Sequence, residues 1–491
     1  MKLRFLLILL FIPGFLEAQE KSMNLEECRQ IALLHNKKIK MAEENKLMMN
    51  SLYKSAKTQN YPRFGINGGY LRTNREFSLL QNDLFLPIVP SESIINGEFD
   101  PSVFYTDPDL MRQTFETGEL FGQPYPLTDE NGDYIFQNYA YIPKDAAKVS
   151  FKDIYMVNFG MTQPIYMGGK IRELNHLAKY GEELFENKKD LTESEVIIET
   201  DKKYWQVISL KEKVKLTTIY KQMIDSLLVD LNNIYEEGII TQNEILKAKV
   251  KYNEVDLKLL KAKNGLSLAQ MALNQTLGFP LDTMINLSDS IVVNTAVMNN
   301  SDLTEEALQN RPEIDMVNST IKIAQSAEKL MRSRYMPNVG LTANYMFMNP
   351  NPYNGFSEDF GGDWSVGVMV NIPLWHWNDK KHTLDAAKHK TKALKEQYDE
   401  AQELITLEVQ QALFKCSESV KKVELTSASL KQAEENLKIT KDNFEEGIVK
   451  TTDLLEAQTM WQQAYSEFIE AKTENKICES ELLKVTGQLN Y

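Results

Sequence analysis

Most of this chain is patterned for long helices, because its apolar residues recur at alternating spacings of three and four. After Tyr235-Glu236-Glu237-Gly238-Ile239 the spacing runs through Ile245, Ala248, Tyr252, Val255, Leu259, Ala262, Leu266, Ala269 and Leu273. After Phe444-Glu445-Glu446-Gly447-Ile448, 209 positions later, it runs through Leu454, Ala457, Trp461, Ala464, Phe468, Ala471, Asn475, Cys478 and Leu482. A sustained 3,4 spacing keeps one seam facing a partner helix. The sequence therefore predicts an internal duplication of long helical hairpins, each packed as an antiparallel coiled coil.

Four other segments alternate apolar and polar residues with a period of two, which predicts β-strands of about 10 residues with one apolar face. These are Phe64–Tyr70, Tyr155–Met161, Val339–Phe347 and Trp364–Leu374. A proline and an aromatic residue stand near each, and we expect the proline to end the strand. The rings suit a membrane interface, although strand-to-helix turns with the rings in a core give the same pattern.

Apart from the N-terminus, apolar runs are shorter than the roughly 20 residues of a membrane helix, so strands would have to form any membrane span. Four strands cannot close a barrel, because the smallest barrels have about eight. We therefore expect several copies of the chain to contribute to one sheet.

The landmarks divide the chain into four parts. Residues 1–18 fit a secretory signal peptide, and residues 19–278 form the first repeat, in the order helix, strand, strand, helix, helix. Residues 279–300 link this repeat to the second, at 301–491. The first repeat carries an insertion at about 72–151, which we expect outside the cell.

The helices are long enough to cross a compartment. The segment 170–237 would extend about 100 Å at 1.5 Å per residue. Helices at 24–58 and 241–277 would stack end to end to a similar length.

Charge and chemistry exclude several function classes. The net charge of −14 disfavours nucleic acid as a partner. The three cysteines, Cys28, Cys416 and Cys478, cannot all pair within one chain, and we expect packed thiols. The five histidines are unclustered, and the sequence shows no catalytic constellation, so we expect no enzyme, metal or cofactor.

From residue 24 to 490, outside the insertion, the chain resembles the TolC-like outer membrane efflux protein family. The duplicated Glu-Gly-Ile tips and duplicated proline-terminated strands carry the resemblance. It implies a mainly α fold with a membrane β-barrel, in which three copies form a 12-stranded barrel in outer-membrane lipid and a coiled-coil α-barrel in the periplasm. It also implies a passive exit duct of a tripartite efflux or type I secretion system, with a periplasmic adaptor (membrane fusion) protein and an inner-membrane transporter as partners. The alternative is a structural periplasmic coiled-coil protein without transport.

The resemblance assigns roles to the hairpin tips. The adaptor would dock at Gly238, Ile239, Ile240, Gly447, Ile448 and Val449. The periplasmic aperture would be lined by Asp453, Glu456 and Glu244, whose carboxylates favour cations. Lys450 would stand in for a gate arginine of the family. Alternatively, Asp453 and Glu456 only stabilise a helix N-terminus.

The turn chemistry gives a further expectation. Gly238 and Gly447 suit a left-handed turn, and Thr241, Thr451 or Thr452 suits the cap of the next helix, with Glu244 at a capping-box distance from Thr241.

Overall fold

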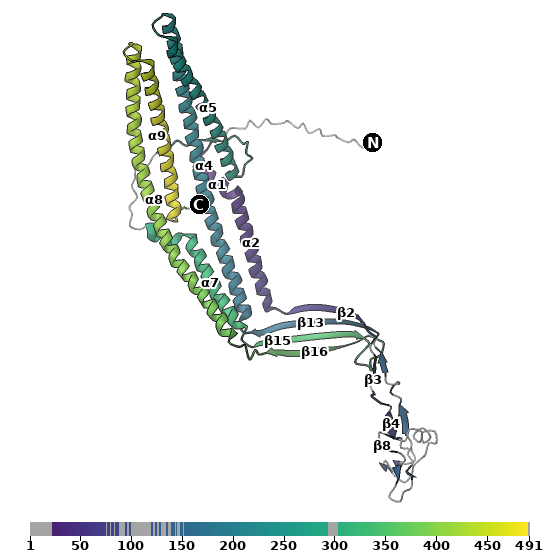
Figure 1. The fold of residues 1–491 in the computed structure, drawn as a ribbon. Helices are drawn as coiled ribbons and strands as arrows, with labels where there is room; N and C mark the ends of the chain where they lie inside the picture. Colours follow the sequence, from purple (N-terminus) through teal and green to yellow (C-terminus); the bar gives the residue numbers. More distant parts are fainter. Residues whose placement is uncertain are drawn as a thin grey trace, which may run out of the picture. The chain divides into compact units, whose positions relative to one another are not determined.

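The structure is a computed structural model that describes residues 22–74, parts of 76–150, residues 152–292 and residues 303–489. The expected signal peptide, most of the insertion and the end of the linker lie outside the described residues. The chain forms two compact units. The first contains the long helices, and the second contains the long strands (Figure 1). The boundaries of the two sequence repeats stay a prediction.

The helical unit has the helices that the 3,4 spacing predicts. They are α1 (Leu25–His35), α2 (Lys37–Lys57), α4 (Lys170–Glu236), α5 (Gln242–Leu277), α6 (Leu303–Asn310), α7 (Pro312–Ser333), α8 (Asp379–Glu445) and α9 (Thr451–Val485). Helices α4 and α8 have 67 residues each, about 100 Å, and begin 209 positions apart. A short 3₁₀ helix, η1 (Thr58–Asn60), follows α2.

Helix α4 pairs with α5, and α8 pairs with α9, as two hairpins (Figure 1). Their seams are buried as predicted: Val255 and Leu273 of α5 are almost fully covered, as are Leu454 and Ala471 of α9. Helix α9 also packs on α4, so the two hairpins share one helical layer. The antiparallel hairpins predicted from the sequence are therefore confirmed.

The expected single helix over residues 24–58 is wrong at one point, because α1 ends and α2 begins at Asn36. The Asn36 backbone is extended (φ −61°, ψ 132°), and its side-chain oxygen accepts from the Lys38 N–H at 2.8 Å. Its amide donates to the Thr276 carbonyl at the end of α5, also at 2.8 Å. At the same end Gly278 has a φ of +78°, and a Cβ there would lie 2.8 Å from the His35 carbonyl oxygen. The break therefore seats the α1–α2 junction against the end of α5.

The second copy repeats this arrangement at the corresponding positions. Gly487 ends α9 with a φ of +70°, and a Cβ there would lie 2.8 Å from Cβ of Asn310, at the junction of α6 and α7. The Arg311 guanidinium of that junction pairs with Glu313 and Glu408. Each glycine thus allows a close approach that a side chain would obstruct.

Buried polar contacts attach the N-terminal segment and the segment after α5 to α4. The Arg29 guanidinium donates to both oxygens of the fully buried Asp201, and these hydrogen bonds raise the pKa of Arg29. The Tyr204 hydroxyl donates to Asp289 at 2.8 Å, and burial together with this hydrogen bond raises the pKa of Tyr204. Strand β1 (Ser22–Met23) pairs in parallel with β14 (Asn286–Leu287) beside these contacts.

All four predicted long strands are present in the second unit. They are β2 (Arg63–Arg72), β13 (Asp153–Met167), β15 (Asn338–Asn349) and β16 (Gly361–Asn371). They form one antiparallel sheet in the order β16-β15-β13-β2. The parts of the insertion that are described form short strands: β3 (Glu76–Ser78), β4 (Leu84–Pro87), β5 (Ile94–Ile95), β6 (Glu98–Phe99), β7 (Glu119–Leu120), β8 (Gln123–Pro124), β9 (Leu127–Thr128), β10 (Tyr134–Ile135), β11 (Tyr139–Ile142) and β12 (Lys148–Ser150).

The expectation that proline ends each strand is wrong for β13, which continues through Pro164 to Met167. Pairing of β13 with β2 ends at Thr162, and the register with β15 shifts between Pro164 and Tyr166. A residue without a backbone N–H is tolerated where one side of the strand has lost its partner and a bulge begins.

None of the described helices combines enough length and enough apolar character to cross a membrane.

The cysteine expectation is wrong for two of the three residues, because Cys416 of α8 and Cys478 of α9 form a disulfide with a Cα–Cα distance of 5.5 Å. The two cysteines are equally distant from Gly447 along the sequence, one before it and one after it, so the hairpin brings them face to face. The equal spacing of the two cysteines from Gly447 can be read from the sequence alone. Cys28 is a buried free thiol, and burial raises its pKa to about 12.

The disulfide generates a stability prediction. The matching positions of the first hairpin, at the same sequence separation from Gly238, hold Val207 and Ala269, which are buried in one core. The variant Cys416→Val/Cys478→Ala should therefore keep the helical fold but lose about 2–4 kcal/mol of stability, because the cross-link no longer restrains the unfolded chain. Urea unfolding followed by circular dichroism should show the lower midpoint. Reductant should lower the wild-type midpoint and leave that of the variant unchanged; equal midpoints for oxidised and reduced wild type would contradict the prediction.

Candidate functional site: hairpin tips and apolar surfaces

The first hairpin tip is a tight turn between α4 and α5. Gly238 adopts a left-handed conformation (φ +78°), with its N–H donating to the Tyr235 carbonyl at 2.9 Å. The Ile239 N–H reaches back to the Ile234 carbonyl at 3.2 Å, which completes a Schellman-type helix end. The Ile239 side chain is 69% exposed at this turn, whereas Ile240 is half-buried.

The second tip has the same backbone. Gly447 has a φ of +75°, and the Ile448 N–H donates to the Asn443 carbonyl at 2.8 Å. Ile448 is 66% exposed, and Val449 is half-buried. The two predicted glycine turns are therefore confirmed. Each presents one aliphatic side chain to the surroundings.

The expected threonine cap is confirmed in position at α5, where Thr241 is the N-cap residue, but not in its side-chain bond, and it is wrong at α9. The Thr241 side chain makes no capping bond to α5, and only its backbone carbonyl accepts from the Glu244 N–H. The Glu244 carboxylate instead accepts from Lys247 Nζ at 2.9 Å. The second capping position is Lys450 rather than Thr451, and its N–H donates to the Asp453 carboxylate at 3.0 Å.

The three acidic residues assigned to the aperture differ in their surroundings. Asp453 and Glu456 are exposed on the first turns of α9, whereas Glu244 is partly covered and paired with Lys247. Asp453 also stabilises the N-terminus of α9, which is the role that we gave above as the alternative to lining the aperture. Lys450 is exposed and, among the described residues, forms no ion pair within 4.0 Å. The aperture and gate roles stay predictions.

The two tips are brought together by an apolar cluster. Leu231 of α4, Ile245 of α5 and Leu454 of α9 are all buried in it, with Ile240 and Phe444 at its edge. The tips therefore cannot move independently without exposing this cluster.

Sequence reasoning missed two exposed apolar stripes. One follows α5 at Leu246, Val250, Leu257, Leu260, Leu268 and Met271, and one follows α8 at Leu404, Leu407, Phe414, Leu425 and Ile439. Both keep the 3,4 spacing of a coiled-coil seam. The signal was present in the sequence, but the pattern alone did not separate a seam buried within the chain from one left open.

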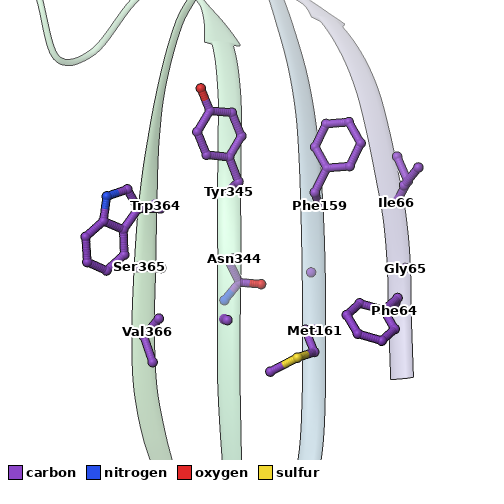
Figure 2. A pocket seen from close by; sticks show the side chains of 12 residues that line it. Phe64, Gly65, Ile66, Phe159, Met161, Asn344, Tyr345, Trp364, Ser365 and Val366 are labelled. Carbon is purple, nitrogen blue, oxygen red and sulfur yellow. The ribbon is translucent and has the colours of Figure 1, made fainter. Parts of the chain in front are cut away.

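The four-stranded sheet has two chemically different faces, and cross-strand pairing aligns them. On one face, Phe64, Met161, Ala343 and Val366 form one row, and Ile66, Phe159, Tyr345 and Trp364 form the next. These residues, with the backbone row between them, surround a hollow of about 710 Å³ on the sheet (Figure 2).

The opposite face carries mainly glycines and polar residues, with methionines among them. Its rows are Gly65, Gly160, Asn344 and Ser365, and Asn67, Asn158, Met346 and Asp363. The apolar face is strongly exposed, including Phe64, Val366 and Trp364. The predicted alternation is therefore confirmed in register across all four strands.

Comparison with known proteins shows which family the second part of the chain resembles. Residues 303–488 match the profile of the family described as "Outer membrane efflux protein". The chain is 19% identical over 285 residues to the alkaline protease secretion protein AprF of Pseudomonas aeruginosa, an alignment that covers 57% of this chain and 58% of AprF. It is 26% identical over 192 residues to the outer membrane protein TolC of Vibrio cholerae, which covers 39% of this chain and 42% of TolC. The chain thus spans about half the length of these curated relatives.

The fold is also that of a solved outer membrane channel. The structure of CmeC from Campylobacter jejuni is similar with a TM-score of 0.68 at 15% identity, covering 95% of this chain and 87% of CmeC. The duplicated hairpins, the two-faced sheet and these matches together lead to one conclusion: the chain has the fold of the solved outer membrane channels, and its residues 303–488 match the outer membrane efflux protein family.

Proposed function

We propose that this protein is the outer membrane channel component of a tripartite efflux or type I secretion system. It would be a passive exit duct in the cell outer membrane that extends into the periplasm. Three copies would form the duct, and a periplasmic adaptor and an inner-membrane transporter would dock to it and supply energy. The observation that carries this proposal is that both units leave apolar surface for which the described residues provide no cover.

The helical unit supports the proposal through its two flanks. Around the tips the helices follow the order α5, α4, α9, α8, so the outer helices carry the open stripes. One stripe of a copy would pack against the other stripe of the next copy. Such a head-to-tail interface uses two different surfaces and closes into a ring when the rotation between copies permits.

The sheet supports the proposal through its edges and faces. Strands β2 and β16 are the outer strands, and among the described residues each pairs on one side only. Unpaired edges are a template for a further strand. Three copies would supply 12 strands, enough to close a sheet whose apolar face meets lipid and whose polar face lines the interior.

The tips support the proposal by their exposed chemistry. Ile239 and Ile448 offer aliphatic contacts for an adaptor, and Asp453 and Glu456 offer carboxylates for an aperture. A ring of six such carboxylates from three copies would attract cations and disfavour anions.

The alternative function, a structural coiled-coil protein without transport, explains the hairpins equally well. It gives no reason for a sheet with one exposed apolar face and one polar face in register. We therefore favour the duct.

The acidic aperture generates a prediction about ion selectivity. Wild-type protein in a planar lipid bilayer should give small, cation-preferring currents. The variant Asp453→Asn/Glu456→Gln should bring the cation-to-anion permeability ratio close to about one, because three copies lose six carboxylates at the narrowest point. Asparagine can still accept the Lys450 N–H, so the helix cap survives the substitution.

A matched control for this measurement is Glu434→Gln/Glu435→Gln, which removes the same charge from exposed positions of α8 away from the tip. Its selectivity should equal that of wild type. An unchanged permeability ratio in the Asp453/Glu456 variant would contradict the aperture assignment. Absence of current from folded wild-type trimers would contradict a duct that conducts without its partners.

The open stripes generate a prediction about assembly. The variant Leu257→Glu/Leu260→Glu places two charges in the α5 stripe and should convert most of the trimer to monomer, because unpaired charges would be buried at the interface. Size-exclusion chromatography with light scattering in detergent should report the change in mass. Ser226→Glu/Asn232→Glu adds the same charge to exposed positions of α4 and should leave the trimer intact. A stable trimer of the α5 variant would show that this stripe is not an interface.

A further inference from the structure

We propose that the start of α8 and the loop before it form a surface that binds the anionic head groups of membrane lipids. The loop contributes Leu374, Trp375 and Trp377. The helix contributes a basic patch, defined as Lys380, Lys381, Lys388, Lys392 and Lys395. The inference deepens the proposed function and rests on it for the presence of a bilayer beside this end of α8.

The patch lies in a positively charged stretch of a protein whose net charge is negative. Residues 379–395 contain six lysines and two aspartates, a net charge of +4, whereas the whole chain carries −14. The matching stretch of the first copy, residues 170–186, contains three basic and four acidic residues, a net charge of −1. The same backbone therefore forms in the first copy without an excess of basic residues.

The lysines of the patch lie on one side of the helix. At 3.6 residues per turn they fall within an arc of about 120°. All five are exposed; the buried Thr391 and Leu394 project from the side where Lys380 lies, whereas Lys381, Lys388, Lys392 and Lys395 cluster within about 60° of one another beside that side. The five ammonium groups therefore act on the same external region.

These lysines have few carboxylate partners, whereas several others in the helical unit form close ion pairs. Among the described residues, only Lys388 has one within 4.0 Å, at 3.7 Å from Asp385. Elsewhere Lys203 and Lys46 lie 2.6 and 2.8 Å from Glu199 and Glu186. The charge of the patch is therefore available to an external anion.

The helix itself gains nothing from the first two lysines. Lys380 and Lys381 lie in the first turn of α8, where the helix dipole disfavours cations. Asp379, the acidic residue of that turn, accepts hydrogen bonds from the Tyr335 and Thr383 hydroxyls. Lysines that oppose the helix dipole and gain no stabilising contact in return indicate a binding role.

The neighbouring loop identifies the anion as part of a bilayer. Leu374, Trp375 and Trp377 are 87%, 72% and 85% exposed, and the two indoles meet edge to face at 5.7 Å. Exposed tryptophans prefer the membrane–water interface, and lysines beside it attract anionic lipids. In the first copy Gly168 stands where Trp377 stands in the second. Indoles followed by lysines with few carboxylate partners fit a phospholipid surface better than a soluble anion.

The test measures lipid preference on the intact protein. Native mass spectrometry of detergent-solubilised wild-type trimers, with either phosphatidylglycerol or phosphatidylcholine added, should show tighter binding of phosphatidylglycerol. In Lys380→Gln/Lys381→Gln/Lys388→Gln that affinity should fall at least about tenfold, since each basic residue near a membrane surface contributes about fivefold. Raising the salt concentration to about 0.5 M should abolish the wild-type preference, because it shortens the Debye length to a few ångströms.

The control is Lys431→Gln/Lys438→Gln/Lys441→Gln, which removes equal charge from exposed positions near the other end of α8. It should keep the wild-type preference. A patch variant that binds phosphatidylglycerol as tightly as wild type, or a wild type without preference, would overturn the inference. Conductance in planar bilayers separates the two proposals. Conducting protein without lipid preference refutes only the lipid surface, and lipid preference without conductance refutes only a duct that conducts without its partners.

Discussion

The seam between paired helices is the constraint on which this structure depends. A helix of 67 residues that carries charges along most of its surface is held in place by burying an apolar stripe rather than by helix propensity alone. A left-handed glycine turn folds each long helix back against a shorter one, so residues equally distant from the glycine meet. Leu210 and Leu266 are equally far from Gly238 along the sequence, and both pack into one core. The position of a single glycine thus sets the register of an entire hairpin.

The two hairpins have the same backbone geometry but different side chains at matching buried positions. Where the first hairpin has Leu210 and Leu266, the second has Ser419 and Asn475, and the Asn475 amide donates to the Ser419 hydroxyl at 3.1 Å. A buried polar pair within a seam favours one register over its neighbours at some cost in stability. The disulfide of the second hairpin replaces an apolar pair of the first in the same way. Because the two hairpins share one backbone geometry but differ in their buried side chains, each copy is an internal comparison for the other.

Local periodicity explains which elements the sequence could predict. The hairpins and the four long strands follow from spacings of 3,4 and of two, which depend only on residues close in the chain. The break at Asn36 was missed because its cause is distant: the α1–α2 junction must clear Gly278 and satisfy the Thr276 carbonyl. The capping box at Thr241 is absent for a local reason, because the Glu244 carboxylate that would complete it pairs with Lys247 three residues further along α5.

The sequence by itself determined the duplication, the hairpin tips and the strand faces, because repeats and periodicity are properties of the chain before it folds. Only the tertiary structure decided which 3,4 stripes are buried within the chain and which remain open, since both kinds share one pattern. It also joined the two tips through Leu454 and left the basic patch of α8 with few carboxylate partners among the described residues. These outcomes depend on which helix lies beside which, and that arrangement is set by packing between residues far apart in the sequence.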